Sequence, residues 1–127
     1  MERRVLFAND DKVMLKFAKL FYEVSKYEVI IAENGLIALE KYLEEKKCGR
    51  NIDLIITDIQ MPRMSGTQFI VELRNNQRYV GPIGIVSGTD VSEYFIKDND
   101  IFYVGFNIED CIRAYEKMRK RKSKEEI

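Results

Sequence analysis

Acidic and polar side chains stand at the ends of several of the five short apolar segments in this 127-residue chain. Those that could do chemistry together are Asn9, Asp10 and Asp11 after the first segment, Asp58 after the third and Ser87 at the end of the fourth; Glu33 and Asn34 after the second are expected to lie away from them. Two carboxylates that converge in a cleft repel each other unless one stays protonated or a cation joins them. Mg²⁺ suits such a pair, because it binds one or two carboxylates, keeps several waters and accepts a phosphate oxygen. These residue types indicate phosphoryl chemistry with an aspartate as the nucleophile.

Each acid taken alone has a structural explanation, since Asp10 or Asp11 could cap the helix that follows it. That explanation does not account for a set of such residues at three segment ends. A carboxylate beside bound Mg²⁺ can attack phosphorus, and the Ser87 hydroxyl and the backbone N–H groups after Asp58 could then donate to phosphoryl oxygens. The sequence contains no histidine, which removes the commonest general base and the commonest metal ligand.

The elements that must position these residues alternate along the chain. The apolar segments are continuous and rich in β-branched and aromatic residues, which predicts parallel strands at residues 4–8, 28–32, 53–58, 83–87 and 101–104. Segments of helical period lie between and after them. This alternation predicts an α/β fold, a doubly wound five-stranded parallel sheet with helices on both faces. We expect the strand order 2-1-3-4-5, which makes the first and third strands neighbours and brings Asp10 and Asp58 together.

Spacings of three and four residues predict the buried faces of the helices. For the helix over residues 12–23 the predicted face is Met14, Phe17, Ala18 and Phe21, and for the next helix it is Leu36, Leu39 and Leu43. Ser65 and Gln68 form a capping-box pattern before Phe69, Ile70 and Leu73. Asn107 is the expected N-cap of a last helix that places Ile108, Cys111, Ile112, Tyr115 and Met118 on one face. Only a short helix fits between, at residues 91–97.

Length and composition indicate one globular domain over residues 1–122, with a charged tail or linker at 123–127. No apolar run reaches the roughly 18 residues of a membrane span, and no membrane partner is expected. Lys and Arg total 21, as do Asp and Glu, so no direct binding of nucleic acid is expected. Cys48 and Cys111 lack the spacing of a zinc or redox site, which favours a cytoplasmic location.

The acid cluster after the first strand, the segment ENGLIAL, the segment DLIITDIQMPRMSG and the hydroxyl at Ser87 together resemble the receiver domains of two-component response regulators. The resemblance covers nearly the whole chain and implies the flavodoxin-like receiver fold. It also implies that Asp58 accepts a phosphoryl group from a histidine kinase or histidine phosphotransfer protein. Mg²⁺ would be held by Asp10, Asp58 and the backbone carbonyl of Gln60, with Asn9 and Asp11 nearby. An output domain or effector protein would respond, as in phosphorelay signalling and hybrid histidine kinases.

Three departures from the family pattern limit this transfer. The family has two acids where this chain has Asn9 and Asp10. The family also ends its fifth strand with a lysine that pairs with the acceptor, whereas the matching residue here is Val104. Lys12 or Lys97 is a candidate substitute. Finally, the stretch from Ser87 to Val104 is short for the family, and the family's aromatic residue in the fifth strand would align with Ile101.

Two other functions fit the same pattern of elements. A pseudo-receiver would use the fold as a protein-interaction module without phosphorylation, which the loss of the lysine favours. A flavin-binding protein needs a phosphate-binding loop after the first strand, but the acids Asp10 and Asp11 there oppose a flavin phosphate. The leading hypothesis is a signalling domain, not an enzyme, that at most catalyses its own phosphorylation and dephosphorylation.

Overall fold

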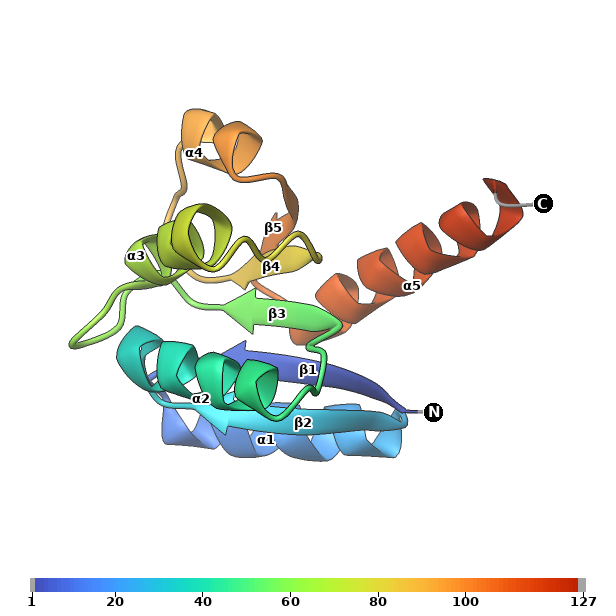
Figure 1. The fold of residues 1–127 in the computed structure, drawn as a ribbon, viewed down its shortest axis with the longest axis horizontal. Coiled ribbons are helices and arrows are strands. Elements are labelled where there is room, and N and C mark those ends of the chain that lie inside the picture. The colour runs from blue at the N-terminus through green and yellow to red at the C-terminus, as the bar shows by residue number, and fades with distance from the viewer. Residues whose placement is uncertain (1, 126–127) are drawn as a thin grey trace.

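A computed structural model describes residues 2–125, with side-chain surroundings described through residue 122. Its five strands are all parallel and form one sheet in the order β2-β1-β3-β4-β5, as the sequence predicts (Figure 1). The strands are β1 Arg3–Ala8, β2 Tyr27–Ala32, β3 Leu54–Thr57, β4 Ile83–Val86 and β5 Ile101–Gly105. Strands β3 and β4 are buried along their whole length, which explains why their sequences are continuously apolar rather than alternating.

Helices cover both faces of the sheet. They are α1 Lys12–Val24, α2 Gly35–Lys47, α3 Gly66–Val71, α4 Glu93–Asp98 and α5 Ile108–Glu125, with a π-helical turn η1 Glu72–Asn76 after α3. Buried residues of α1 and α5 share one core cluster, and those of α2 and α3 share the other. Helix α4 has six residues, as short as the sequence predicts. Helix α5 continues into the predicted tail, whose last two residues lie outside the described part.

The predicted buried faces are correct for two helices and wrong in part for two others. The capping box of Ser65 and Gln68 is present, and Asn107 accepts hydrogen bonds at the start of α5. In α1, however, Leu15, Ala18 and Tyr22 are buried while Phe17 is 50% exposed. In α2, Ala38 and Tyr42 are buried and Leu43 is exposed. Both corrections have one cause, because in each helix an alanine and the tyrosine four residues after it lie on the buried face, whereas Phe17 and Leu43 lie outside it.

Burial of acidic protons makes the fold sensitive to alkaline pH. Burial raises the pKa of the Cys111 thiol to about 12, and it raises the pKa of the Tyr22 and Tyr79 hydroxyls above 10.0. The folded state therefore keeps protons that the unfolded state releases. This stabilisation is complete below the ordinary thiol pKa of 9.0 and is lost as pH rises toward about 12.

We expect the free energy of unfolding to fall between pH 9 and pH 10.5, measured by urea titration at several pH values. Each group protonated only in the folded state contributes a slope of about 1.4 kcal/mol per pH unit. Cys111→Ala removes one such group, so its stability should fall less steeply than that of the parent protein. Equal slopes for the two proteins would contradict the assignment to Cys111.

Candidate functional site

The ends of β1 and β3 meet at the carboxyl edge of the sheet. Ala8 and Thr57 are partners in the strand register, and the backbone N–H of Asp58 donates to the carbonyl of Ala8 over 2.9 Å. The residues that follow each strand, Asn9 and Asp58, therefore leave the sheet side by side. This placement confirms the predicted meeting of the acid cluster after the first strand with the aspartate after the third.

Two of the three polar residues after β1 are engaged locally. Asn9 is buried, and its Oδ1 accepts a hydrogen bond from the backbone N–H of Asp11 over 2.9 Å. Asp11 is the N-cap of α1, since its Oδ1 accepts from the N–H groups of Val13 and Met14. Asp10 is exposed, and within the described residues its carboxylate has no hydrogen bond or ion pair. Asp10 is thus the acid of this cluster that is free to take a ligand.

Asp58 is half-buried at the start of the loop after β3. Its Oδ1 accepts a hydrogen bond from the backbone N–H of Ile59 over 2.6 Å, while Oδ2 has no protein donor among the described residues. The Thr57 hydroxyl donates to the Asp58 carbonyl over 2.8 Å, a contact that a threonine in a strand does not reveal in sequence. No lysine or arginine of the described chain forms an ion pair with Asp58, and this includes Lys12 and Lys97.

Two glycines hold the loop between β3 and α3 close to Asp58. The N–H of Gly66 donates to the Ile59 carbonyl over 2.8 Å, and the N–H of Gly35 at the start of α2 donates to the Met64 carbonyl over 3.0 Å. A Cβ atom added to Gly66 would lie 1.8 Å from the Asp58 carbonyl oxygen. The backbone can therefore close over Asp58 only where residue 66 has no side chain.

We expect Gly66→Ala to lower the free energy of unfolding by about 1–3 kcal/mol, because the backbone it would strike cannot rotate away. The matched control is Gly88→Ala, since a Cβ there meets nothing within 4 Å. The control should change stability by less than about 0.5 kcal/mol. Urea unfolding of both variants tests this, and equal stabilities would show that the loop can relax around the added methyl group.

Strands β4 and β5 place Ser87 and Val104 at the same carboxyl edge of the sheet. Ser87 is buried, its N–H donates to the Gly105 carbonyl over 2.9 Å, and its Oγ accepts from the N–H of Thr89 over 3.2 Å. Val104 pairs in register with Ile85, which pairs in turn with Thr57. The Val104 side chain is 40% exposed. The position that matches the family's lysine therefore lies level with the end of β3 but has an apolar side chain.

The donor set suits a hard cation that keeps waters. Within the described residues, no group of three or more His, Cys, Asp or Glu side chains could hold a metal ion. Asp10 and Asp58 supply two carboxylates that have no cationic partner among the described residues, and the Gln60 carbonyl follows Asp58 by two residues. Mg²⁺ accepts one or two carboxylates together with waters and phosphate oxygens. These residues therefore fit Mg²⁺. The Oδ1 atoms of Asn9 and Asp11 are weaker candidate ligands, because they already accept hydrogen bonds from backbone N–H groups.

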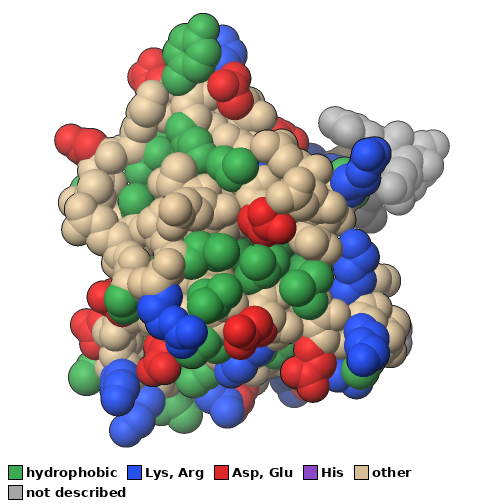
Figure 2. All heavy atoms as spheres, turned by 60° about the vertical axis from the view of Figure 1, so that its left-hand side comes forward, with side chains coloured by type: hydrophobic (Ala, Val, Ile, Leu, Met, Phe, Trp, Pro, Cys, Tyr) green, Lys and Arg blue, Asp and Glu red, His purple; other side chains and the backbone are tan. Residues whose placement is uncertain are grey.

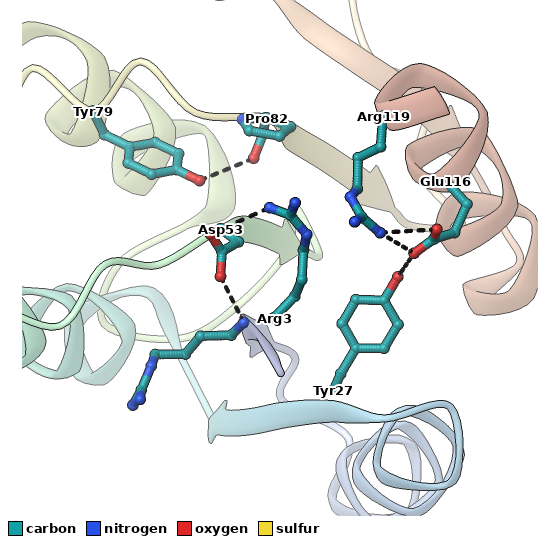
Figure 3. Close-up of polar contacts among 8 residues, drawn as sticks. Arg3, Tyr27, Asp53, Tyr79, Pro82, Glu116 and Arg119 are labelled. Carbon is teal, nitrogen blue, oxygen red and sulfur yellow. Dashed lines mark hydrogen bonds and ion pairs between the residues drawn. The ribbon is translucent and has the colours of Figure 1, made fainter. Parts of the chain in front are cut away.

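The face at the carboxyl edge differs from the opposite end of the sheet. Figure 2 shows hydrophobic side chains around isolated acidic ones on this face. At the opposite end, a cavity of about 520 Å³ is lined by residues that include Arg3, Asp53 and Arg119. Arg3 pairs with Asp53, and Arg119 pairs with Glu116, which also accepts from the Tyr27 hydroxyl (Figure 3). Those charges are already paired, so this cavity is not the better candidate site.

No helix in the part of the chain described here has both the length and the apolar character needed to cross a membrane.

Comparison with known proteins points to one family. The family described as the response regulator receiver domain matches residues 5–106. The response regulator GtcR of Aneurinibacillus migulanus is 32% identical over 113 residues, covering 88% of this chain and 41% of that protein. The response regulator DivK of Brucella anthropi is 30% identical over 89 residues, covering 68% of each.

Solved structures agree with this match. A CheY-like receiver domain of Methanospirillum hungatei superposes with a TM-score of 0.82 at 24% identity, covering 98% of this chain and 99% of that chain, a likeness of fold. The receiver domain of Francisella response regulator 1452 has a TM-score of 0.77 at 28% identity, covering 95% and 99%. The chain spans only 12% to 41% of the length of the first four curated relatives it matches, which include the sensor kinase/phosphatase CqsS of Vibrio cholerae.

Proposed function

Since this chain belongs to the family of response regulator receiver domains, we propose that Asp58 accepts a phosphoryl group from a phosphohistidine donor in a Mg²⁺-dependent reaction. Receiver domains are signalling domains that accept phosphoryl groups. The observation that carries the assignment to Asp58 is its place at the end of β3, beside the acid cluster that follows β1. It is also half-buried, with one carboxylate oxygen held by the Ile59 N–H and the other without a hydrogen-bond donor among the described residues.

The reaction requires Asp58 as an ionised nucleophile. A carboxylate oxygen of Asp58 attacks phosphorus, an O–P bond forms, and the P–N bond to the donor histidine breaks with its electron pair left on the imidazole. The hydrogen bond from the Ile59 N–H to Oδ1 orients the carboxylate so that Oδ2 is presented for attack. Asp10, Asp58 and the Gln60 carbonyl would hold Mg²⁺, which when bound neutralises the negative charge gathered on the carboxylates and the phosphoryl oxygens.

Ser87 is the proposed partner of the phosphoryl group. Its Oγ accepts a hydrogen bond from the Thr89 N–H, so the hydroxyl keeps its own proton to donate. A phosphoryl oxygen on Asp58 is the proposed acceptor, and forming that bond would draw the segment after β4 toward the site. Such a movement would change the protein surface that an output domain or effector protein contacts.

The valine at position 104, where the family has a lysine, lowers the rate of phosphorylation that we expect. A preorganised cation near the acceptor would stabilise the charge of the transition state, and this chain has no cation paired with Asp58 among the described residues. We therefore propose slow phosphorylation. The proposed donors are a histidine kinase or a histidine phosphotransfer protein, and the proposed location is the cytoplasm, which suits two free cysteines.

The proposal is tested by incubating the protein with Mg²⁺ and a small acyl phosphate and measuring its intact mass over several hours. We expect the mass of one added phosphoryl group, and we expect EDTA to prevent it. An unchanged mass with Mg²⁺, also in the presence of a phosphorylated histidine phosphotransfer protein, would overturn the proposal.

A further inference from the structure

Helix α1 has a second apolar face that nothing in the described chain covers. Its side chains are large and strongly exposed, at 76%, 50%, 65% and 82% for Val13, Phe17, Leu20 and Val24. These four residues, here called the outer stripe, recur at spacings of four, three and four. Figure 1 shows α1 along the outer edge of the molecule, beyond β2 and away from α4.

The outer stripe is not part of the core packing of α1. Leu15, Ala18 and Tyr22 bury the inner face, about half a turn away around the helix. A surface helix needs only one apolar face to pack on its own domain. A second one, with the spacing of a coiled-coil seam, indicates a partner helix.

The residues that flank the outer stripe are arranged for self-pairing. By helical geometry, Lys16 and Glu23 lie along one flank, while Met14 and Phe21 lie along the other. Among the described residues Glu23 forms one ion pair, with Lys19 at 3.9 Å on the exposed surface, and such a pair holds weakly. One flank thus carries opposite charges at its two ends, and the other flank is apolar throughout.

We propose that α1 pairs with α1 of a second copy of this chain in antiparallel orientation, through the outer stripe. In that orientation each flank meets the same flank of the second copy, reversed end to end. Lys16 of each copy then meets Glu23 of the other, and Met14 meets Phe21. Parallel pairing would instead set the charged flank against the apolar one. The complementarity of charge and apolar surface therefore selects a symmetric antiparallel pair.

The size of the helix sets the strength of this pairing. Helix α1 has 13 residues and is about 20 Å long. Its outer stripe alone buries less area than a standard stable interface, so we expect a weak dimer with a dissociation constant of ~100 μM. Val13 follows Asp10 by only three residues, so the paired helices begin beside the candidate site.

Sedimentation velocity from about 10 μM to about 1 mM tests the pairing. The sedimentation coefficient should rise with concentration from that of a monomer to that of a dimer. Leu20→Glu should raise the dissociation constant at least about tenfold, because it places a charge in an apolar seam. The matched control is Val80→Glu, which adds the same charge at a residue 92% exposed outside α1 and should leave dimerisation unchanged.

Charge reversal tests the orientation. Lys16→Glu and Glu23→Lys should each weaken self-association, because each gives the charged flank a single sign. An equal mixture of these two variants should associate again, and so should the double variant Lys16→Glu/Glu23→Lys. Circular dichroism confirms that each variant is folded.

Three outcomes would overturn the proposal. They are a parent protein that stays monomeric to about 1 mM, a dimer insensitive to Leu20→Glu, and charge-reversed variants that fail to associate when mixed. A monomeric parent protein that loses another protein's binding through Leu20→Glu would show that a different protein occupies the outer stripe.

Discussion

Asp58→Asn is expected to abolish the phosphoryl adduct, because an amide oxygen lacks the charge and the lone-pair reactivity of a carboxylate. The substitution keeps the size of the side chain and an oxygen that can accept from the Ile59 N–H. The fold should therefore persist while the chemistry is lost. Intact mass after several hours with Mg²⁺ and a small acyl phosphate should show the mass of one added phosphoryl group for the parent protein and none for the variant.

Two further variants separate the roles of the acids. Asp10→Asn should slow adduct formation and raise the Mg²⁺ concentration required, because it removes one of two proposed carboxylate ligands. Asp98→Asn at the end of α4 removes an exposed acid far along the chain from both and should have no effect. An adduct of undiminished yield on Asp58→Asn would show that another residue is phosphorylated. If neither the parent protein nor any variant forms an adduct, the chain would work as an interaction module instead.

The five parallel strands could be predicted from simple signals, whereas their order, and with it the meeting of β1 with β3, was taken from the usual order of doubly wound sheets. Strands buried on both faces have continuous apolar sequences, and β3 and β4 show this directly. Polar residues at strand ends stand out against such segments, which is why Asp58 and the cluster around Asp10 were identifiable. Which acid serves as a helix cap was not, because Asp10 and Asp11 have equal preference for that position and only the observed backbone assigns it to Asp11.

The buried face of helix α1 was predicted wrongly because the helix has two apolar faces. The predicted face mixed Ala18 from the inner side with Phe17 from the outer stripe, because apolar residues recur at helical spacing on both sides. The signal for the second face was present in the run Val13, Phe17, Leu20 and Val24. It could be separated from the first only once the sheet showed which side of the helix was already covered.

Strand β5 was harder to predict in detail. Ile83 pairs with Ile101 but Gly84 pairs with Tyr103, so Phe102 is an additional residue in the ladder. Such a bulge changes which side chains face the core, and no turn residue in 101–104 signals it.

The π-helical turn η1 was also unexpected. The Arg74 guanidinium in η1 donates to the carbonyls of Tyr79 and Gly81, just before β4. It also donates to the carbonyls of Asn99 and Asp100, just before β5, and these contacts join segments that are distant in sequence.

Restoring a cation at the end of β5 is expected to accelerate phosphorylation. Neighbouring strands lie about 4.8 Å apart, so β5 is about 10 Å from β3, a span that lysine and aspartate side chains can bridge together. Val104 is level with Ile85 and Thr57 in the strand register, and it is 40% exposed, so a lysine ammonium there stays in contact with water. Val104→Lys should therefore fold normally and direct its charge toward Asp58.

The size of the effect follows from what one preorganised donor contributes to a charged transition state. About 3 kcal/mol of stabilisation corresponds to roughly a hundredfold in rate, so Val104→Lys should form the adduct about a hundredfold faster than the parent protein. Val104→Met is the matched control, since it has a similar length and no charge and should leave the rate unchanged. Val80→Lys tests whether added charge alone matters, because residue 80 is exposed and follows η1. Equal rates for Val104→Lys and Val104→Met would mean that Asp58 does not use a cation from β5, and that the valine reflects a different way of stabilising the phosphoryl group.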